Sequence, residues 1–399
     1  MTKLSVAQVA LGGKRVFLRA DFNVPLKDGR VADDTRITAV LPTLRHCLDA
    51  GAAVVVASHL GRPKGQPDPA FSLAPVAAHL AGRLDRPVPM APDCVGPETE
   101  AMASGLEPGE VLLLENLRFH KEEEANDEGF ARGLAALADV YVNDAFAAAH
   151  RAHASIEAIT RFLEPAAAGL LMSRELAALS RIFERPQRPL LAVLGGAKVS
   201  DKLGLVEHLL EKVDGLLVGG GMAFTFLAAL GHDVGRSLLE SDRIEAARQA
   251  LDRARTRGIT VRLPVDVVAA AGVDASEGIR TVPVREIPRD RMGLDIGEGT
   301  VTQFAAALKN AGTIVWNGPM GVFEKPAFAA GTMGVARAVA ASGGFSVIGG
   351  GDTIAAVQAA GVTDRIGYIS TAGGAFLEFL EGRELPGVAA LSDAPAEAA

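Results

Sequence analysis

The sequence contains little cysteine and no long uninterrupted hydrophobic run. Only two cysteines occur among its 399 residues, and the spacing of Cys47 and Cys94 fits neither a disulfide framework nor a structural zinc site. No run approaches the roughly 20 apolar residues that a membrane-spanning helix needs, and charged residues follow the first apolar stretch too soon for a signal peptide. We therefore expect a cytoplasmic protein without a membrane partner, whose cysteines are inert core residues.

The chain also lacks an excess of positive charge. Lys and Arg total 40 against 48 Asp and Glu, which gives a formal net charge of -8. A nucleic-acid partner is therefore not expected, and any anion-binding site must be a local concentration of basic groups. The sequence has no Walker A pattern and no complete G-x-G-x-x-G, which argues against a P-loop NTPase and against a standard dinucleotide fold.

Apolar residues are plentiful, at 49% of the chain, and this length favours two domains. Strand-like apolar runs alternate with helical patterns in both halves, as in "AAVVVASHLGR" and "FSVIGGGDT". This alternation predicts α/β domains with parallel sheets that are buried on both faces. Between the halves, "GLLMSRELAALSRIFERPQRP" has the spacing of one helix face and predicts a helix that connects two domains around a cleft.

The two halves differ in the residues that follow their strands. In the first half these residues are Arg, His, Asp and Asn, whereas in the second half they are glycines. In open α/β sheets the ligand lies outside the carboxyl ends of the strands. We therefore expect one half to grip an anionic substrate with side chains and the other to hold phosphates with backbone amides.

Basic and polar side chains recur after strands of the first half. Guanidinium groups bind carboxylate and phosphate in a bidentate manner, and several of them at one sheet edge would neutralise a multiply charged small acid. Any one of these arginines alone is better explained as a surface or ion-pair residue, and the two histidines fit structural hydrogen bonding equally well. The candidates come from "RADFNVP", "DDTRI", "SHLGRPKG", "LENLRF" and "AHRAHAS" and are Asp21, Asn23, Arg36, His59, Arg62, Arg118, His150 and Arg151.

Lysines, acids and a threonine accompany the glycines of the second half. "GGAKVSDK" places Lys198 and Lys202 four residues apart, which predicts one face of a helix whose ammonium groups reach phosphates. "GGGDT" supplies Asp352, a hard oxygen ligand suited to Mg²⁺, and Thr353, a helix cap or phosphate donor. Glu324 in "WNGPMGVFE" is suited to accept hydrogen bonds from ribose hydroxyls. A single glycine turn is equally compatible with a tight connection that binds nothing.

Eight segments resemble, in the same order, the motifs of the phosphoglycerate kinase family. They are "RADFNVP", "SHLGRPKG", "LENLRF", "AHRAHAS", "GGAKVSDK", "WNGPMGVFE", "GGGDT" and "LEFLEG", and they span about residues 15–388. The resemblance implies two Rossmann-like parallel-sheet domains that face a cleft. Their expected bounds are 1–168 for phosphoglycerate binding, 169–186 for a connecting helix, 187–371 for nucleotide binding, and 372–399 for a C-terminal segment that packs back on the first domain.

The resemblance also implies an activity and a set of site residues. The reaction would be reversible transfer of the acyl phosphate of 1,3-bisphosphoglycerate to Mg-ADP, giving ATP and 3-phosphoglycerate, in a cytoplasmic monomer that closes about a hinge. The substrate side would use Asp21, Phe22, Asn23, Arg36, His59, Leu60, Gly61, Arg62, Arg118 and Arg151. The nucleotide side would use Gly195, Lys202, Gly219, Gly220, Gly293, Asn317, Glu324, Gly350, Gly351, Asp352 and Thr353. The catalytic groups would be Arg36, Lys198, Gly350 and Gly373, with Asp352 as the Mg²⁺ ligand.

The chain departs from the family pattern in two places. Ala147 and Ala148 replace a glycine and a hydroxyl residue before Arg151, and Ala372 replaces a glycine before Gly373. Because Gly373 and Gly374 remain, we expect the anion-binding turn to survive.

Two other functions remain to be compared with this one. A dinucleotide oxidoreductase shares strand-glycine-helix turns but needs the fingerprint that this chain lacks. A catalytically silent nucleotide-binding protein on the same fold would bind nucleotide without turnover, although the charged residues at both sets of strand ends are present.

Overall fold

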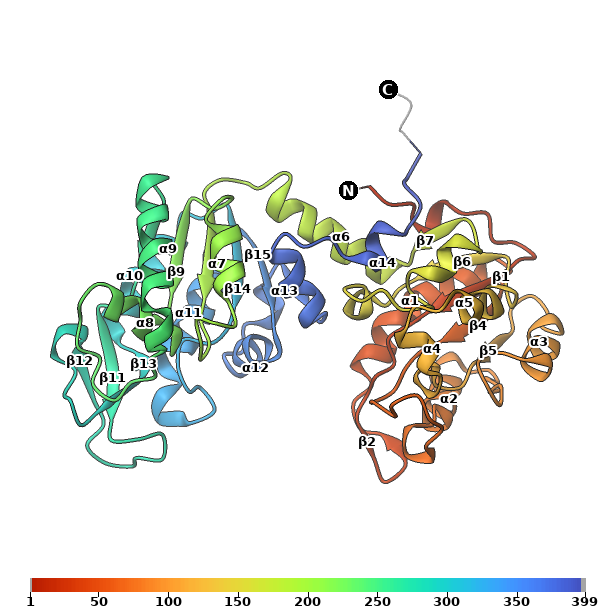
Figure 1. Cartoon of the computed structure of the whole chain (residues 1–399), viewed down its shortest axis with the longest axis horizontal. Helices are drawn as coiled ribbons and strands as arrows, with labels where there is room; N and C mark the ends of the chain where they lie inside the picture. Colours follow the sequence, from red (N-terminus) through yellow and green to blue (C-terminus); the bar gives the residue numbers. More distant parts are fainter. Residues whose placement is uncertain (1, 396–399) are drawn as a thin grey trace. The chain divides into compact units, whose positions relative to one another are not determined.

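The computed structural model describes residues 2–395, and the chain divides into two compact units (Figure 1). Unit 1 contains the residues up to Ala177 together with the segment from Glu384, and unit 2 runs from Ala178 to Arg383. The division falls inside helix α6 (Leu170–Phe183), which overlaps the helix expected over residues 169–186. Residues 372–383, expected in the C-terminal segment of the first domain, lie in unit 2, because α13 (Gly374–Leu380) packs on α7 (Leu203–Leu209) there.

Unit 1 is built on a five-stranded parallel sheet with the strand order β5-β4-β1-β6-β7. Its strands are β1 (Arg15–Arg19), β4 (Ala53–Ala57), β5 (Val111–Leu113), β6 (Val140–Asn143) and β7 (Ala166–Ala168), and β2 (Leu26–Lys27) pairs with β3 (Arg30–Val31) in a short hairpin. Its helices are α1 (Thr35–Asp49), α2 (Ala74–Leu84), α3 (Pro97–Ser104), α4 (Lys121–Glu124), α5 (Glu128–Ala135) and α14 (Pro386–Ala389).

The strands of unit 1 are buried because their sequences are nearly continuous apolar runs. Every residue of β4, with the sequence AVVVA, is buried, as expected for a central strand of a parallel sheet. Helix α1 carries Ile37, Val40 and Leu44 at spacings of three and four, and these side chains share one core with Val54 and Val56 of β4. This packing fixes where each strand ends and therefore where the polar residues that follow it lie.

The segment from Glu384 completes unit 1 by joining the beginning of the chain. The backbone N–H of Leu4 donates to the Ser392 carbonyl over 2.9 Å, and the N–H of Ser392 donates to the Ala166 carbonyl of β7 over 2.9 Å. The Lys3 ammonium donates to the Leu391 carbonyl over 2.9 Å. The first and last described segments of the chain therefore lie side by side at the β7 edge.

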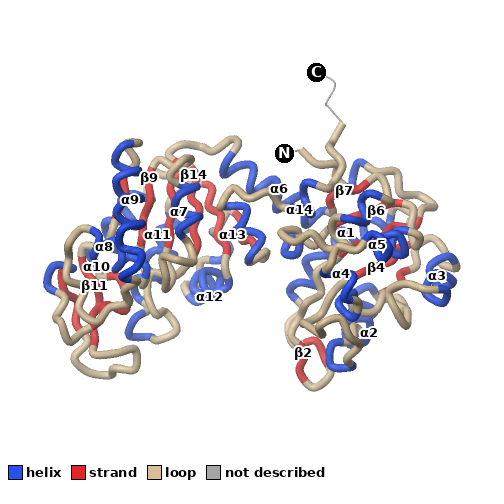
Figure 2. Tube along the Cα trace, viewed as in Figure 1, coloured by secondary structure: helices blue, strands red, loops and turns tan. Residues whose placement is uncertain are grey.

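Unit 2 contains a six-stranded parallel sheet with the order β10-β9-β8-β14-β15-β16. The strands are β8 (Leu190–Leu194), β9 (Gly215–Val218), β10 (Thr260–Arg262), β14 (Thr313–Asn317), β15 (Phe345–Gly349) and β16 (Tyr368–Ser370). Its remaining helices are α8 (Met222–Ala229), α9 (Ile244–Thr256), α10 (Glu298–Leu308), α11 (Ala330–Ala341) and α12 (Gly351–Ala359). Figure 2 shows these helices flanking the strands.

A separate three-stranded antiparallel sheet extends unit 2. Strand β11 (Asp266–Ala270) lies between β12 (Arg280–Pro283) and β13 (Met292–Ile296). The sequence analysis predicted only parallel sheets and did not identify this one, because β12 is exposed and β11 is only partly buried, so neither has the continuous apolar pattern. Its own apolar cluster includes Val267, Phe224 and Val284.

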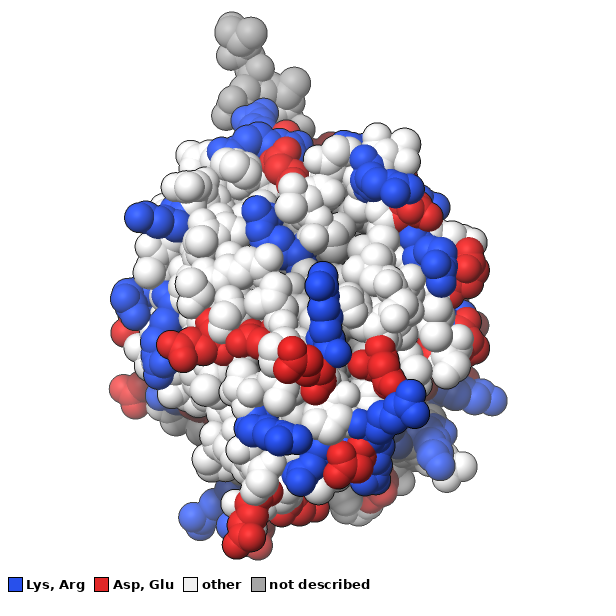
Figure 3. Space-filling model, turned by 90° about the vertical axis from the view of Figure 1, so that its left-hand side faces the viewer, with Lys and Arg blue, Asp and Glu red and all other residues white. Residues whose placement is uncertain are grey.

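The described part of the chain contains no helix that is both long enough and apolar enough to cross a bilayer. Figure 3 shows one face of the molecule, on which basic and acidic side chains are interspersed rather than gathered by sign.

Candidate functional site

Unit 1 gathers its predicted residues at the carboxyl ends of β1 and β4. Arg19 at the end of β1 lies beside Ala57 of β4 and Asn143 of β6 in the strand register, so the segments that follow emerge at one edge. Arg36, in the first turn of α1, forms an ion pair with Asp21. The Asp21 carboxylate also accepts the N–H of Asn23 over 3.0 Å. The Asp21 carboxylate thus holds both the Arg36 guanidinium and the backbone N–H of Asn23.

Hydrogen bonds tie the first two strand-end segments together through Gly61. Its N–H donates to the Asn23 side-chain oxygen over 2.9 Å, and its carbonyl accepts from the Arg118 guanidinium over 2.8 Å. Gly61 has a φ of +61°, and a Cβ there would overlap the ring of Phe71, so glycine is required at this position. Three predicted residues from three separate segments therefore form one bonded cluster.

Positive groups outnumber negative ones around this cluster. Burial lowers the pKa of Arg118, and the nearby charges of Arg19 and Arg151 lower it further, against Glu124. Arg62 and Arg151 are exposed at its margin, and the Arg151 guanidinium contacts the His150 ring over 3.1 Å. Such an arrangement is suited to an anion with several charges.

Two predicted substrate residues present no side chain to a ligand. Phe22 is 0% exposed and Leu60 is 4% exposed, and both belong to the core of unit 1. Their backbone N–H groups are also engaged, that of Phe22 by the Ser58 hydroxyl over 2.8 Å and that of Leu60 by the Asn116 side chain over 3.2 Å. They position their neighbours in the chain.

Unit 2 brings its glycine turns together at the carboxyl ends of β8, β9, β14 and β15. Gly220 has a φ of +66°, and a Cβ there would lie 2.6 Å from the N of Gly196 and 2.8 Å from the carbonyl oxygen of Pro319. At Gly195, a Cβ would overlap that same Pro319 oxygen. The loops are packed backbone against backbone, which is possible only without side chains.

Asn317 and Thr353 hold these turns in place. The Asn317 side chain donates to the Gly349 carbonyl over 2.7 Å, and the Thr353 hydroxyl accepts the Gly318 N–H over 2.8 Å. Thr353 is 1% exposed, so its hydroxyl supports the loop. Gly350, with a φ of +96°, precedes α12, whose first N–H groups are free of helical partners by geometry.

Lys202 lies beneath the glycine turns. Its ammonium donates to the Gly195 carbonyl over 2.6 Å and to the Asn317 side-chain oxygen over 2.5 Å. Burial lowers the pKa of Lys202 to about 8, and the carboxylate of Asp352 opposes this shift. A buried ammonium with a lowered pKa is readily stabilised by an incoming anion.

The prediction that Lys198 and Lys202 share a helix face is wrong. Helix α7 begins only at Leu203, and the preceding turn is fixed by Glu240, whose carboxylate accepts the N–H of Val199 over 2.5 Å and that of Ser200 over 3.0 Å. Lys198 is consequently exposed in a turn.

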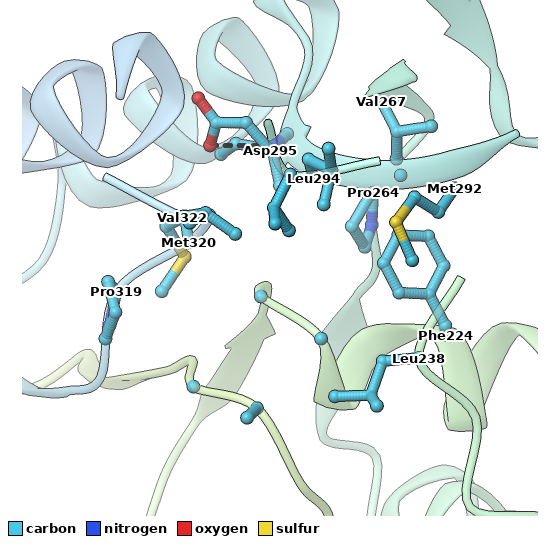
Figure 4. A pocket seen from close by; sticks show the side chains of 18 of the residues that line it. Phe224, Leu238, Pro264, Val267, Met292, Leu294, Asp295, Pro319, Met320 and Val322 are labelled. Atoms are coloured by element: carbon cyan, nitrogen blue, oxygen red, sulfur yellow. Dashed lines mark hydrogen bonds between the residues drawn. The ribbon is translucent and has the colours of Figure 1, made fainter. Parts of the chain in front are cut away.

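A pocket of about 370 Å³ opens beside the glycine turns. It is lined by four predicted residues, Gly220, Gly293, Glu324 and Asp352. Most of its wall is apolar and comes from α8, the antiparallel sheet and the loop after β14, as Figure 4 shows. These wall residues, missed by the sequence analysis, include Phe224, Leu238, Val267, Met292 and Met320. An apolar slot bordered by glycine turns has the chemistry for an aromatic base linked to phosphates.

Asp295 is a further pocket residue that the sequence analysis missed. Its carboxylate accepts the N–H of Gly331, at the start of α11, over 2.7 Å and that of Ile296 over 2.9 Å. Burial raises the pKa of Asp295 to about 7. It joins β13 to α11 and thereby shapes the wall of the pocket.

Both departures from the family pattern, at residues 147–148 and at Ala372, are accommodated without positive φ. Ala148 packs in a small cluster with Ala145 and Ile156, and Ala372 is buried and donates its N–H to the Ser370 hydroxyl over 3.3 Å. Gly373 keeps a φ of +55° at the start of α13. Among the described residues, positive φ at a non-glycine occurs at Asp28, Lys64, Asp85 and Asn126 and not at Ala372.

Among residues 2–395, one cluster of metal-ligand residue types lies outside the predicted set, at Asp93, Cys94 and His120. The His120 ring contacts the Asp93 carboxylate over 2.5 Å, and the Cys94 thiol donates to the Glu115 carbonyl over 3.0 Å. Burial raises the pKa of Cys94 well above its usual range. These contacts describe a hydrogen-bonded cluster with a protonated thiol.

Comparisons with known proteins agree with this architecture. The family model of phosphoglycerate kinase matches residues 6–383. The chain is 55% identical to the phosphoglycerate kinase of Moorella thermoacetica, over 98% of this chain and 100% of that protein. It is 56% identical to the enzyme of a Synechococcus strain, over 96% of each.

Solved structures give the same result. The phosphoglycerate kinase of Coxiella burnetii superposes with a TM-score of 0.92 at 44% identity, covering 97% of this chain and 98% of that one. The enzyme of Pyrococcus horikoshii OT3 gives a TM-score of 0.82 at 37% identity, with the same coverage. The chain belongs to the phosphoglycerate kinase family.

Proposed function

We propose that this chain catalyses the glycolytic phosphoglycerate kinase reaction with the charged strand ends of unit 1 and the glycine turns of unit 2. The reaction transfers the acyl phosphate of 1,3-bisphosphoglycerate reversibly to ADP and gives ATP and 3-phosphoglycerate. The observation that carries the proposal is the pocket of about 370 Å³ beside the glycine turns. The family assignment and the names of the relatives support the enzyme, and they lend no support to the catalytically silent alternative.

In this proposal the phosphoglycerate lies against the cluster of unit 1. Asn23, His59, Arg62, Arg118 and Arg151 supply the hydrogen-bond donors and positive charge that an anion with a carboxylate and phosphates requires. Asp21 acts through Arg36 and Asn23, which it positions. Gly61, Phe22 and Leu60 contribute through the backbone that they shape.

The nucleotide occupies the pocket of unit 2. The base lies against the apolar wall near Gly293, and Glu324 accepts from the ribose. The phosphates lie along the turns at Gly195, Gly219 and Gly220 and at the start of α12, where Gly350 and Gly351 offer their N–H groups. Lys202, Asn317 and Thr353 support those turns.

We propose Asp352 as the residue that holds Mg²⁺ together with the nucleotide phosphates. Its carboxylate is exposed in the first turn of α12 and lines the pocket, which fits a hard cation shared with phosphate oxygens. When bound, the ion neutralises charge on the phosphates.

Transfer requires positioning and neutralisation of charge, and no general base is needed, because the attacking nucleotide oxygen is already ionised. Arg36, Lys198 and the N–H groups of Gly350 and Gly373 stabilise the phosphoryl group in flight. Because the two substrates bind to different units, we propose closure about α6 to bring them into line and exclude water. We also propose that the enzyme acts on these small molecules as a cytoplasmic monomer without nucleic acid.

The test is ATP-dependent phosphorylation of 3-phosphoglycerate with Mg²⁺, coupled to removal of the acyl phosphate. We expect turnover by the intact chain and a sharp loss in Asp352→Ala. Nucleotide binding without turnover by the intact chain would refute the catalytic proposal. Unchanged turnover in the variant would refute the metal role alone.

A further inference from the structure

A network of charged side chains is buried next to the unit 1 cluster formed by Asn23, Gly61 and Arg118. Arg19, the last residue of β1, is 1% exposed, and Glu123 of α4 is 0% exposed. The guanidinium Nη2 of Arg19 and the Oε1 of Glu123 are 4.0 Å apart. A buried ion pair costs desolvation energy that a pair of apolar side chains would not. The other hydrogen bonds of Arg19 and Glu123 therefore show what compensates for this cost.

Ser155 joins the two charged groups in a way that fixes the direction of each hydrogen bond. Its hydroxyl oxygen accepts from Arg19 Nε over 2.8 Å, and its hydroxyl proton goes to Glu123 Oε1 over 2.6 Å. The Ser155 N–H donates to Glu123 Oε2 over 2.9 Å. Arg19 Nη1 donates to the Ala20 carbonyl. The guanidinium is therefore held in one orientation with its charge compensated.

The remaining group of this guanidinium contacts His59. Arg19 Nη2 lies 3.2 Å from His59 Nδ1. A guanidinium has only N–H donors and cannot accept a hydrogen bond. Nδ1 must therefore carry a lone pair, and the proton of the neutral ring must be on Nε2. Within residues 2–395, Nε2 of His59 has no protein hydrogen-bond partner.

We propose that Arg19 is a positioning residue that holds His59 as the neutral Nε2–H tautomer, so that His59 donates one hydrogen bond to an anionic group of the substrate. The proposal rests on the proposed function in one respect, that His59 faces bound phosphoglycerate. In this proposal His59 orients the substrate through one directional hydrogen bond and adds no charge to the site. The positive charge comes from Arg62, Arg118 and Arg151.

The surroundings of His59 favour the same state. Burial places the pKa of His59 well below its usual value, and the guanidinium groups of Arg19 of β1, Arg118 after β5 and Arg36 of α1 lower it further. The neighbouring His153 adds no charge in this range, because burial lowers its own pKa to about 3. An imidazolium would also place a proton of Nδ1 against the guanidinium. The His59 ring therefore stays neutral throughout the physiological pH range. Its Nε2–H remains a hydrogen-bond donor when the substrate changes its own protonation state.

The first test is ¹⁵N-histidine NMR of the whole protein, with the His59→Gln variant to assign the signal. We expect an unprotonated, pyridine-type Nδ1 and a protonated Nε2 between pH 6 and 8. A protonated Nδ1 in this range, in either the cation or the other tautomer, would overturn the proposal. No variant needs to fold for this result except the one used for assignment.

Addition of 3-phosphoglycerate separates this inference from the proposed function. We expect the Nε2–H signal to shift while Nδ1 stays unprotonated. If the tautomer is as expected but 3-phosphoglycerate leaves Nε2–H unchanged in an active enzyme, the donor role of His59 is overturned while the kinase assignment stands. If the protein lacks kinase activity, the assignment fails independently of the tautomer.

Arg19→Lys tests whether the guanidinium sets the tautomer. This variant keeps the charge opposite Glu123 but loses the fork that reaches Ser155 and Nδ1 together. We expect a mixture of tautomers, a roughly tenfold higher KM for 3-phosphoglycerate, as for one lost hydrogen bond to a charged group, and little change in kcat. Should Arg19→Lys not fold, Arg19→Met combined with Glu123→Gln removes both charges and gives the same readout. A pure Nε2–H tautomer in the folded variant would refute the positioning role.

Discussion

In the proposed function, the two units bind phosphate groups with opposite kinds of site. Unit 1 presents charged and amide side chains: Asp21 is paired with Arg36, and Asn23 and Arg118 are both hydrogen-bonded to the backbone of Gly61. Unit 2 presents turns in which backbone lies against backbone, with an apolar pocket beside them. Substitutions that remove side-chain atoms weaken the site of unit 1, whereas substitutions that add a side chain to a glycine weaken the site of unit 2. The two sites therefore call for different variants.

The largest effect is expected from the side chains that meet the phosphoryl group in flight. Arg36→Ala and Lys198→Ala should each lower kcat by at least about 100-fold with little change in KM, because a contact made mainly in the transition state is lost. Steady-state kinetics with both substrates varied would measure this. Near-normal kcat in either variant would remove that residue from catalysis, and for Arg36 a matching rise in KM would point to ground-state binding instead.

Adding one methyl group to the backbone site should give the next largest effect. In Gly195→Ala the new Cβ overlaps the Pro319 carbonyl oxygen, and relief of that contact displaces the loop at a cost of about 1–3 kcal/mol. We expect a KM for nucleotide raised by roughly tenfold or more, with the KM for 3-phosphoglycerate nearly unchanged. Gly272→Ala is the matched control, since its Cβ meets nothing within 4 Å. Equal behaviour of the two variants would contradict the close packing of the turns.

Asp295 should make part of the stability of unit 2 depend on pH. Its folded pKa of about 7 lies above the ordinary value of 3.8 for an aspartic acid side chain, so the folded state binds more protons than the unfolded state between about pH 4 and pH 7. The stabilisation is fully present below about pH 4 and is lost as the pH rises to about 7. Because each pKa unit corresponds to about 1.4 kcal/mol, Asp295→Asn should gain on the order of 4 kcal/mol of stability relative to the natural protein across this window.

Denaturant unfolding at several pH values would measure this difference. Asp290→Asn is the control, because the Asp290 side chain is largely exposed and its replacement should show no such trend. A constant difference in unfolding free energy between natural protein and Asp295→Asn from pH 4 to 7 would contradict the buried-acid interpretation.

The smallest difference between the two sites is expected in how their substrate KM values respond to ionic strength. Salt screens exposed guanidinium groups such as Arg62 and Arg151 more than it screens backbone amides in a partly apolar pocket. Between about 0.05 and 0.3 M salt, the KM for 3-phosphoglycerate should rise a few-fold more than the KM for nucleotide at saturating Mg²⁺. The reverse order would contradict the division into a side-chain site and a backbone site.

The difference between the charged strand ends of unit 1 and the glycine turns of unit 2 was predictable from the sequence, because buried parallel strands have a strong local pattern. Nearly continuous apolar runs such as β4 mark the strands, and the residues after them follow automatically at one edge. The parallel sheets are those that this reasoning predicts. The contacts of Asp21 with Arg36 and of Asn23 with Gly61 were not predicted as pairs, because each joins two segments that are separated in the sequence.

Other features depend on contacts between distant segments and left no local signal. The pocket wall of Phe224, Val267 and Met292 consists of residues that read as ordinary core. The turn before α7 is hydrogen-bonded to Glu240, which lies more than one element further along the chain. Asp295 belongs to the same class, because its role comes from an N–H group of α11.

The segment from Glu384 to residue 395 has a consequence for biosynthesis. A ribosome releases the chain from its first residue onward, so all of unit 2, which is one continuous stretch from Ala178 to Arg383, emerges before this segment does. Until then the β7 edge of unit 1 lacks the partner that Ser392 supplies to Ala166. We expect this edge of unit 1 to close only after the Ser392 segment has left the ribosome, when all of unit 2 is already outside it.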